Sequence, residues 1–312
     1  MNAQLTTAYS VRRGIARREA RNFYYSFLAL PRDKRNALSA VYAFMRHADD
    51  LSDDESRAPA ERLQQLSDWL DSWHAVEAGT ASSDPVFVAL ADAQQRYAIP
   101  GRLLDQLVEG TSMDLRTAQA DAYEREYRTA AVTAAATLHV PQTFAELYRY
   151  CYLVASVVGL VCIRIYGYHD IRAEELAERC GIAFQLTNII RDVREDAGRA
   201  RVYFPQEDLA RFDLSAEEFL NLDALELSRL KPLLDFEAGR ARKYYEAADE
   251  LVPLIHEDSR AALWVMVSIY RRLLERIAEL NYDVLHARVR LTASEKLGIL
   301  GRGLMKSVFR TI

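Results

Sequence analysis

Apolar residues recur at helical spacing along nearly the whole chain. In residues 60–76, for example, Leu63, Leu66 and Leu70 fall three or four positions apart, which places them on one face of a helix. We find no run that alternates apolar and polar residues as a half-buried strand does, no internal repeat, and no linker rich in glycine, serine or proline. The pattern predicts an all-α bundle that forms a single domain over residues 1–312.

The bounds of the expected helices follow from this periodicity and from the prolines that begin or end helices. Residues 143–167 are apolar nearly all round, which is typical of a buried central helix. Pro31 ends the first helix, and Pro85 and Pro100 each stand in the first turn of a new one. We predict helices at residues 16–29, 60–76, 143–167, 171–196, 222–251, 259–287 and 293–309. Three more are predicted to begin at residues 33, 85 and 100, and the first of these runs into the acidic stretch near residue 50. Loops are predicted at residues 78–85, 197–215 and 287–292.

Composition excludes several classes of protein. The chain has only 12 glycines and 8 prolines in 312 residues, which disfavours turn-rich β folds. Its three cysteines include no Cys-x-x-Cys pair, which disfavours a disulfide framework or a structural zinc site and is typical of a reducing cytoplasm. The formal net charge of -5 argues against a general nucleic-acid binder.

Signals for membrane insertion are weak in the sequence. The N-terminal residues contain no apolar core of a secretory signal. The longest apolar run, residues 152–163, is shorter than the roughly 20 residues needed to span a bilayer. The C-terminal residues 297–312 are basic and mildly amphipathic, so they form either a final packed helix or a contact with an anionic membrane surface. We therefore expect a cytoplasmic protein, with peripheral contact at the inner face of the membrane as an option.

A first cluster of acidic residues lies at residues 49–55, where an apolar helix ends. Asp49 and Asp53 are four residues apart and project from one helix face, with Tyr42 and Arg46 on the preceding turns. Like charges at this spacing destabilise a helix, and the partial negative charge of the helix C-terminus adds to the repulsion. The cluster is therefore either a solvated helix end or a cation site.

A second acidic cluster repeats the pattern far along the chain. Asn188, Asp192 and Asp196 follow one another at intervals of four, and Gln185 lies one turn earlier on the same side. Taken alone, this cluster also fits an exposed face with local ion pairs. Two carboxylate pairs that face each other across a helical cavity would instead hold Mg²⁺ or Mn²⁺, which prefer oxygen ligands and bind substrate phosphates.

Other catalytic sites fit the sequence poorly. A helical di-iron site needs paired Glu-x-x-His motifs, and an EF-hand needs its own loop spacing; neither occurs. No Gly-x-Ser-x-Gly motif suggests a nucleophile. The chemistry indicated is the binding of a diphosphate through metal ions and arginines.

Together these segments resemble the squalene/phytoene synthase family of head-to-head prenyl transferases, over roughly residues 16–290. The resemblance rests on four blocks, and the third is the most specific. They are FYYSFLALP followed by AVYAFMRHADDLSDD, YCYLVASVVG, QLTNIIRDVREDAGRARVYFP, and VSIYRRLLERI followed by Tyr282 and Arg288. The family implies an all-α isoprenoid-synthase fold around a deep apolar cavity.

The resemblance also implies a role for individual residues. Metal ligands would be Asp49, Asp53, Asn188, Asp192 and Asp196. Diphosphate groups would be bound by Arg46, Arg191, Arg288, Gln185 and Asn22. Catalytic residues would be Tyr42, Arg46, Tyr152, Tyr203 and Tyr270. Phe23, Phe27, Phe44 and Tyr166, together with Tyr152, would line the cavity, although each could equally be ordinary core.

Two positions depart from the family pattern. Ala20-Arg21-Asn22 stands where the family often has a serine pair, so one diphosphate would be held differently, through Arg21 or Asn22. Ser156 stands where the family commonly has glycine in the central helix, which narrows the cavity slightly.

The resemblance implies Mg²⁺-dependent coupling of two prenyl diphosphates, with Mn²⁺ as a possible substitute. The blocks look most like bacterial presqualene diphosphate synthases of the hopanoid pathway, which join two C15 farnesyl diphosphates without NADPH. Alternatives are a phytoene synthase that joins two C20 units, an NADPH-dependent squalene or dehydrosqualene synthase, chain elongation, terpene cyclisation, and a non-catalytic scaffold. Expected partners are the prenyl diphosphates, a membrane surface and downstream isoprenoid enzymes, but no nucleic acid.

Overall fold

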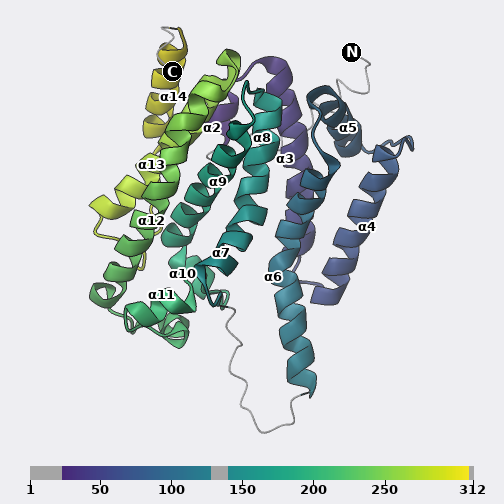
Figure 1. Cartoon of the computed structure of the whole chain (residues 1–312). Helices are drawn as coiled ribbons and strands as arrows, with labels where there is room; N and C mark the ends of the chain where they lie inside the picture. The colour runs from purple at the N-terminus through teal and green to yellow at the C-terminus, as the bar shows by residue number, and fades with distance from the viewer. Residues whose placement is uncertain (1–22, 128–139, 309–312) are drawn as a thin grey trace.

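The computed structural model describes residues 23–127 and 140–308, in which the regular structure is helical (Figure 1). Within those ranges there is no β-strand; residues in isolated bridges include Tyr168 and Ile255, which form an antiparallel pair. The prediction of an all-α fold is confirmed. The helices are α2 (Phe23–Phe27), α3 (Arg32–Ser52), α4 (Pro59–Glu77), α5 (Pro85–Tyr97), α6 (Gly101–Tyr127), α7 (Phe144–Cys151), the π-helical turn η1 (Tyr152–Ser156), α8 (Val157–Tyr166), α9 (Arg172–Arg191), α10 (Val193–Ala197), α11 (Gln206–Arg211), the 3-10 helix η2 (Ala216–Asn221), α12 (Leu227–Leu254), α13 (Glu257–Glu279) and α14 (Ala293–Val308).

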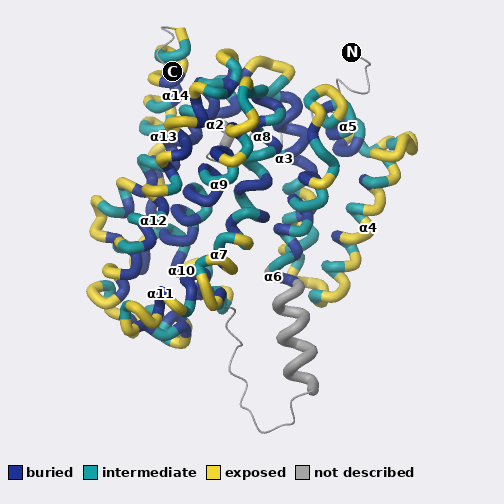
Figure 2. Tube along the Cα trace, in the orientation of Figure 1, coloured by how far each residue is buried: buried dark blue, intermediate teal, exposed yellow. Residues whose placement is uncertain are grey.

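Helix α9 lies inside the bundle. It packs against η1 and α8 on one side and against α12 and α13 on the other (Figure 1). Helix α3 packs against α4, α5, α6 and α8, and α8 packs in turn against α9. The first acidic cluster lies at the end of α3, and the second runs from α9 into α10. A buried apolar cluster extends from Phe27 in α2 to Leu300 in α14 and holds both groups of helices together (Figure 2).

Three of the predicted helices end or break at positions that the apolar pattern did not indicate. The segment predicted at 143–167 contains the π-helical turn η1, which inserts wider turns between α7 and α8. The segment predicted at 171–196 breaks at Asp192, between α9 and α10. The segment predicted at 259–287 ends at Glu279, because Asn281 and Tyr282 adopt positive φ angles of 53° and 61°.

The stretch Phe144–Tyr166, formed by α7, η1 and α8, is long and apolar enough to cross a membrane, by length and composition alone. Its 23 residues contain a window with a mean hydropathy of 1.5. In this structure the stretch lies in the bundle against α6 and α9, and no residue from Cys151 to Tyr166 is exposed. A core helix accounts for its composition.

Candidate active site

The acidic pair of α3 borders a polar cavity of about 220 Å³. Asp49 lies in the last turn of α3 and Asp53 caps the helix, and the Asp53 N–H donates to the Asp49 carbonyl oxygen at 2.8 Å. This backbone bond preserves the predicted spacing of the two carboxylates across the helix end. Both acids line the cavity, together with Ser52, Tyr150 and Arg201.

The Asp49 carboxylate is placed where ionisation is unfavourable. Burial raises its pKa to about 6; the positive charge of Arg46 opposes this shift, whereas Asp53 and Asp50 reinforce it. The guanidinium of Arg46 is itself paired with Asp50 at 2.5 Å, an exposed carboxylate one turn away. A cation bound in the cavity would relieve the repulsion between Asp49 and Asp53.

We expect Asp49→Asn to stabilise the protein at pH 7.5 in the absence of divalent cations. Folding raises the pKa of Asp49 from near 4 to about 6. Between these two pH values the unfolded chain ionises more readily than the folded one, so the folded protein loses stability as the pH rises. Removal of the charge should therefore add about 1–3 kcal/mol at pH 7.5 and little at pH 4. Thermal unfolding at both pH values measures this difference. Asp71→Asn on the exposed side of α4 is the control; equal gains for both variants would contradict the assignment.

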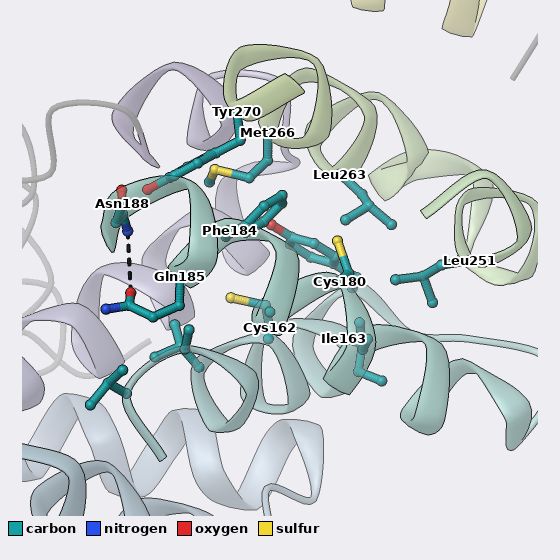
Figure 3. Close-up of a pocket in the computed structure, with 17 residues that line it drawn as sticks. Cys162, Ile163, Cys180, Phe184, Gln185, Asn188, Leu251, Leu263, Met266 and Tyr270 are labelled. Carbon is teal, nitrogen blue, oxygen red and sulfur yellow. Dashed lines mark hydrogen bonds between the residues drawn. The ribbon is translucent and has the colours of Figure 1, made fainter. Parts of the chain in front are cut away.

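A second, apolar cavity of about 130 Å³ lies between α8, α9, α12 and α13 (Figure 3). Tyr166, Leu251 and Leu263 line it, and Phe184 stacks on Tyr270 with ring centroids 4.5 Å apart. Burial raises the pKa of the thiols of Cys162 and Cys180, each to about 12, so both remain neutral. The cavity therefore presents hydrocarbon, aromatic rings and uncharged sulfur to a ligand.

Two amides from α9 enter this apolar cavity. The Asn188 side chain donates to the Gln185 side-chain oxygen at 3.3 Å, and Figure 3 shows Asn188 between Gln185 and Tyr270. The Asn188 Oδ1 is buried and has no hydrogen-bond partner in the structure. Because a buried polar atom without a partner is costly, this oxygen is available to a ligand or a cation.

The two cavities share a wall at Val154, in the π-helical turn η1. Glycines on both sides let the neighbouring helices approach this turn. A Cβ at Gly110 of α6 would lie 2.9 Å from the Leu153 carbonyl oxygen, and one at Gly181 of α9 would lie 2.5 Å from the Ser156 Cα. The irregular turn therefore brings the carboxylates of α3 and the amides of α9 to adjoining spaces.

The second acidic cluster is held by arginines. Asp192 accepts hydrogen bonds from Arg288 at 2.9 and 3.0 Å and from the Arg191 Nε at 2.7 Å, and Arg288 also pairs with Glu195 at 2.9 Å. Burial lowers the pKa of Arg191, but its hydrogen bonds to Asp192 outweigh this effect and raise the pKa above the ordinary value. The Asp192 carboxylate is thus neutralised by two guanidinium groups.

The predicted metal ligands are not brought together in one place: Asp49 and Asp53 border the polar cavity and Asn188 the apolar one, whereas Asp192 and Asp196 border neither. In the ranges that the structure describes, no group of three or more histidine, cysteine or acidic side chains is gathered closely enough to hold a metal ion. The side chains of this predicted set would offer a metal ion only oxygen atoms: the carboxylates of Asp49, Asp53, Asp192 and Asp196 and the orphan Asn188 Oδ1, of which the Asp192 carboxylate is bonded to Arg191 and Arg288 in this structure. Such a set fits Mg²⁺ when further oxygen ligands come from a bound phosphate group and from water.

The remaining predicted residues fall into three groups. Tyr166 and Tyr270 line the apolar cavity, and Tyr203 stacks at 4.7 Å on Tyr150, which lines the polar cavity. Tyr42 and Tyr152 are half-buried and pack against the core. Asn22, Arg21 and the side chain of Phe23 lie outside the part of the chain that the structure describes.

Phe44 and Phe27, which were predicted to line a cavity, do not border either of the two cavities described above. The Phe44 side chain of α3 is fully buried against α4, where its ring centroid lies 5.7 Å from that of Trp69 and 5.9 Å from that of Trp73. Phe27 is 4% exposed in the core. Their aromatic side chains gave no indication of which way they point.

Several residues at the cavities were not assigned a role from the sequence. Tyr150, Val154 and Arg201 lie inside the quoted blocks YCYLVASVVG and GRARVYFP, but helical spacing alone did not single them out. The signal was present in the case of Arg201, a basic residue five positions after Asp196 in a segment rich in arginine.

Comparison with known proteins shows the family to which the chain belongs. A model of the squalene/phytoene synthase family matches residues 16–295. A phytoene synthase of Mycobacterium tuberculosis is 35% identical over 98% of this chain and 93% of its own length. A 15-cis-phytoene synthase of Synechococcus elongatus is 32% identical, over 98% of this chain and 95% of its own.

Solved structures show the same fold. A dehydrosqualene synthase crystallised with a ligand superposes with a TM-score of 0.82 and 26% identity, over 99% of this chain and 98% of the other. A squalene synthase of Alicyclobacillus acidocaldarius gives a TM-score of 0.75 at 23% identity, over 91% of this chain and 97% of the other, and supports the fold alone. The chain therefore belongs to the squalene/phytoene synthase family, whose members are enzymes of the prenyltransferase type.

Proposed function

We propose that this protein couples two allylic prenyl diphosphates head to head, in a reaction that depends on Mg²⁺. One observation carries the proposal: an apolar cavity with aromatic walls adjoins a polar cavity with two carboxylates, and the two meet at Val154. This arrangement matches a ligand that has a hydrocarbon tail and a charged diphosphate head. Magnesium ions, when bound by Asp49, Asp53, Asn188, Asp192 and Asp196, would neutralise the leaving diphosphate.

The chain's own residues account for the other requirements of the reaction. Arg191 and Arg288 would donate to diphosphate oxygens, because guanidinium groups bind phosphate as readily as the Asp192 carboxylate that they now hold. The apolar walls exclude water from the allylic cation that forms when the diphosphate leaves. The stacked rings of Tyr270 and Phe184 offer π faces that attract such a cation.

We propose farnesyl diphosphate as the substrate and presqualene diphosphate as the product. In this reaction the double bond of the second molecule attacks the cation of the first, and loss of a proton gives a cyclopropyl diphosphate. The names of the relatives favour a second candidate, the coupling of two geranylgeranyl diphosphates to phytoene, since two of them that are 35% and 32% identical are phytoene synthases. In either case we propose cytoplasmic catalysis without a requirement for NADPH.

A product assay tests these proposals. Purified protein with Mg²⁺ receives farnesyl or geranylgeranyl diphosphate, with and without NADPH, and the lipids are identified by mass spectrometry. We expect presqualene diphosphate from the C15 substrate, unchanged by NADPH. Phytoene from the C20 substrate would select the second candidate, and squalene formed only with NADPH would indicate a full squalene synthase. If neither substrate gives a coupled product, the proposed function is wrong.

A further inference from the structure

The apolar cavity has one end with amides and one end that is apolar throughout. Figure 3 shows Gln185 and Asn188 on one side of the cavity and Leu251 and Leu263 on the other. The amide end adjoins the polar cavity, because Val154 lines both. A prenyl chain whose diphosphate lies near the carboxylates of α3 would therefore extend towards Leu251 and Leu263.

Tyr166 stands at the apolar end of the cavity. A Cβ at Gly159 of α8 would lie 3.2 Å from the Ala177 carbonyl oxygen of α9. Ser156 comes earlier in the chain than Gly159 but lies against Gly181, which comes later than Ala177, so the two segments are antiparallel. Tyr166 is the last residue of α8 and lines the cavity there, at the end away from the amides.

The Tyr166 side chain points back into the cavity. Side chains on a helix lean towards its N-terminus and meet the residue four positions earlier, which for Tyr166 is Cys162. Burial raises the pKa of the Tyr166 phenol well above its ordinary value, and the thiols of Cys162 and Cys180, which also line the cavity, add to this shift. The phenol therefore lies beside the two thiols, at the end of the path that a prenyl chain would follow.

Hydrogen bonds hold the backbone at Tyr166 in place. The Lys34 Nζ of α3 donates to the Tyr166 carbonyl oxygen at 2.6 Å and to the Asp258 carboxylate of α13 at 2.6 Å. The carbonyl oxygen of the next residue, Gly167, accepts a hydrogen bond from the His256 N–H at 2.9 Å. The end of α8 is thus joined to α3 and α13, so a longer ligand does not readily push Tyr166 aside.

Helix α9 gives the length of the cavity. Asn188 and Ala177 both line it and stand eleven positions apart, which is about 16 Å at a rise of about 1.5 Å per residue. An isoprene unit adds four carbon–carbon bonds of about 1.5 Å each, or roughly 5 Å of extended chain. Three units need about 15 Å and match the cavity, whereas four need about 20 Å and do not.

We propose that Tyr166 sets the upper limit on the length of the prenyl chain, at the three isoprene units of a farnesyl group. The phenol takes the space that a fourth unit would need, and the hydrogen bond from Lys34 keeps the end of α8 in place. This inference rests on the proposed function and separates its two candidates, because a geranylgeranyl group has four units. A closely packed interior accommodates added carbon atoms poorly, which corresponds to a loss of about tenfold or more in binding.

Binding of unreactive analogues tests the proposal without turnover. Farnesyl and geranylgeranyl thiodiphosphate carry sulfur in place of the oxygen that leaves with the diphosphate, and calorimetry with Mg²⁺ gives their dissociation constants. We expect the wild type to bind the C15 analogue at least tenfold more tightly than the C20 analogue. Tyr166→Ala should remove this preference, by binding the C20 analogue about tenfold more tightly than the wild type does. Tyr166→Leu, which keeps an apolar side chain in the core, should give a smaller shift in the same direction.

Two variants are matched controls. Tyr166→Phe keeps the ring and removes only the hydroxyl group, so the preference for the C15 analogue should stay within about twofold of that of the wild type. Phe44→Leu removes a fully buried ring that borders neither cavity, and should leave the preference unchanged. Coupling activity is assayed separately. The expected shift in binding without any coupled product would reject the proposed function and leave the role of Tyr166 standing.

Four results would overturn the proposal. They are no binding of either analogue, binding of the C20 analogue by the wild type as tight as that of the C15 analogue, an unchanged preference in both Tyr166→Ala and Tyr166→Leu, and an equal shift in Phe44→Leu.

Discussion

Asp192→Asn should reduce the turnover of prenyl diphosphate by about a thousandfold. Asp192 is a proposed metal ligand, and loss of one charged contact to a developing negative charge typically costs between a hundredfold and a thousandfold. Asparagine also leaves the guanidinium groups of Arg191 and Arg288 without their carboxylate partner, so the arrangement that receives the diphosphate changes as well. The measurement is a single-turnover rate at saturating Mg²⁺, below the unfolding temperature of the variant.

The control for Asp192→Asn is another aspartate that pairs with an arginine. Asp223 bonds to Arg194 at 2.7 Å but is largely exposed, so Asp223→Asn should leave the rate within a factor of two. A second readout separates a metal role from a structural one: Mg²⁺ with inorganic diphosphate should raise the Tm of the wild type and of Asp223→Asn, but not that of Asp192→Asn. Turnover by Asp192→Asn within tenfold of the wild type would remove Asp192 from the proposed metal site.

The helices and the spacing of the acids were predictable because both depend on local geometry. The spacing of apolar residues identifies the helix faces. Acids four residues apart stay one helical turn apart even where the helices end. The Asp192 N–H donates to the Asn188 carbonyl oxygen at 2.8 Å and the Asp196 N–H to the Asp192 carbonyl oxygen at 2.9 Å, so the turns continue through the break between α9 and α10. Asp49 and Asp53 behave in the same way at the end of α3.

The rest of the candidate site depends on contacts between distant residues or on irregular backbone. The pairing of Asp192 with Arg288 joins positions 96 residues apart, and no periodicity indicates it. The π-helical turn η1 does not change the apolar pattern of the sequence, because its segment is apolar on all sides. The turn nevertheless sets the position of Val154 between the two cavities. Phe44 shows the same limit, since an aromatic residue in an apolar helix fits a core and a cavity wall equally well.

Arg240 belongs to a buried group of charged residues outside the two cavities. We expect Arg240→Met to lower the free energy of unfolding by about 3–5 kcal/mol at pH 7.5. The Arg240 guanidinium bonds to Asp208 of α11 at 2.8 Å and to Glu237, one turn earlier in α12, at 2.8 Å. It also lies 4.1 Å from the centre of the Phe144 ring, at the start of α7. The substitution would leave two buried carboxylates without a counter-charge, and Tm should fall by roughly 5–10 °C.

The effect of Arg240→Met should grow with pH. Burial raises the pKa of Glu237 to about 7, whereas the charge of Arg240 opposes the shift. The protein therefore loses stability as the pH rises from the pKa of Glu237 in the unfolded chain, near 4.5, through its pKa in the folded protein. Without Arg240 that folded value rises further, so at pH 8 the variant carries a larger penalty than at pH 5, where Glu237 is protonated in both proteins.

Two further variants show whether uncompensated charge causes the loss. Arg57 also pairs with two carboxylates, Asp54 and Glu61, but on an exposed surface, so Arg57→Met should leave Tm unchanged. Adding Glu237→Gln to Arg240→Met should recover part of the stability and flatten the pH dependence, because one buried carboxylate is then absent. No recovery would mean that packing against Phe144, rather than charge, makes Arg240 necessary.

The Arg240 group also bears on the candidate site through the chain segment that it anchors. Asp208 follows the segment that carries Arg201 to the polar cavity and Tyr203 to Tyr150. The Gln206 N–H of the same segment donates to the Pro141 carbonyl oxygen at 2.8 Å, just before α7. If the anchor acts through these residues, Arg240→Met should raise the KM for the diphosphate substrate more than it lowers kcat, even at temperatures where the variant is fully folded. An unchanged KM with a lower Tm would restrict Arg240 to stability.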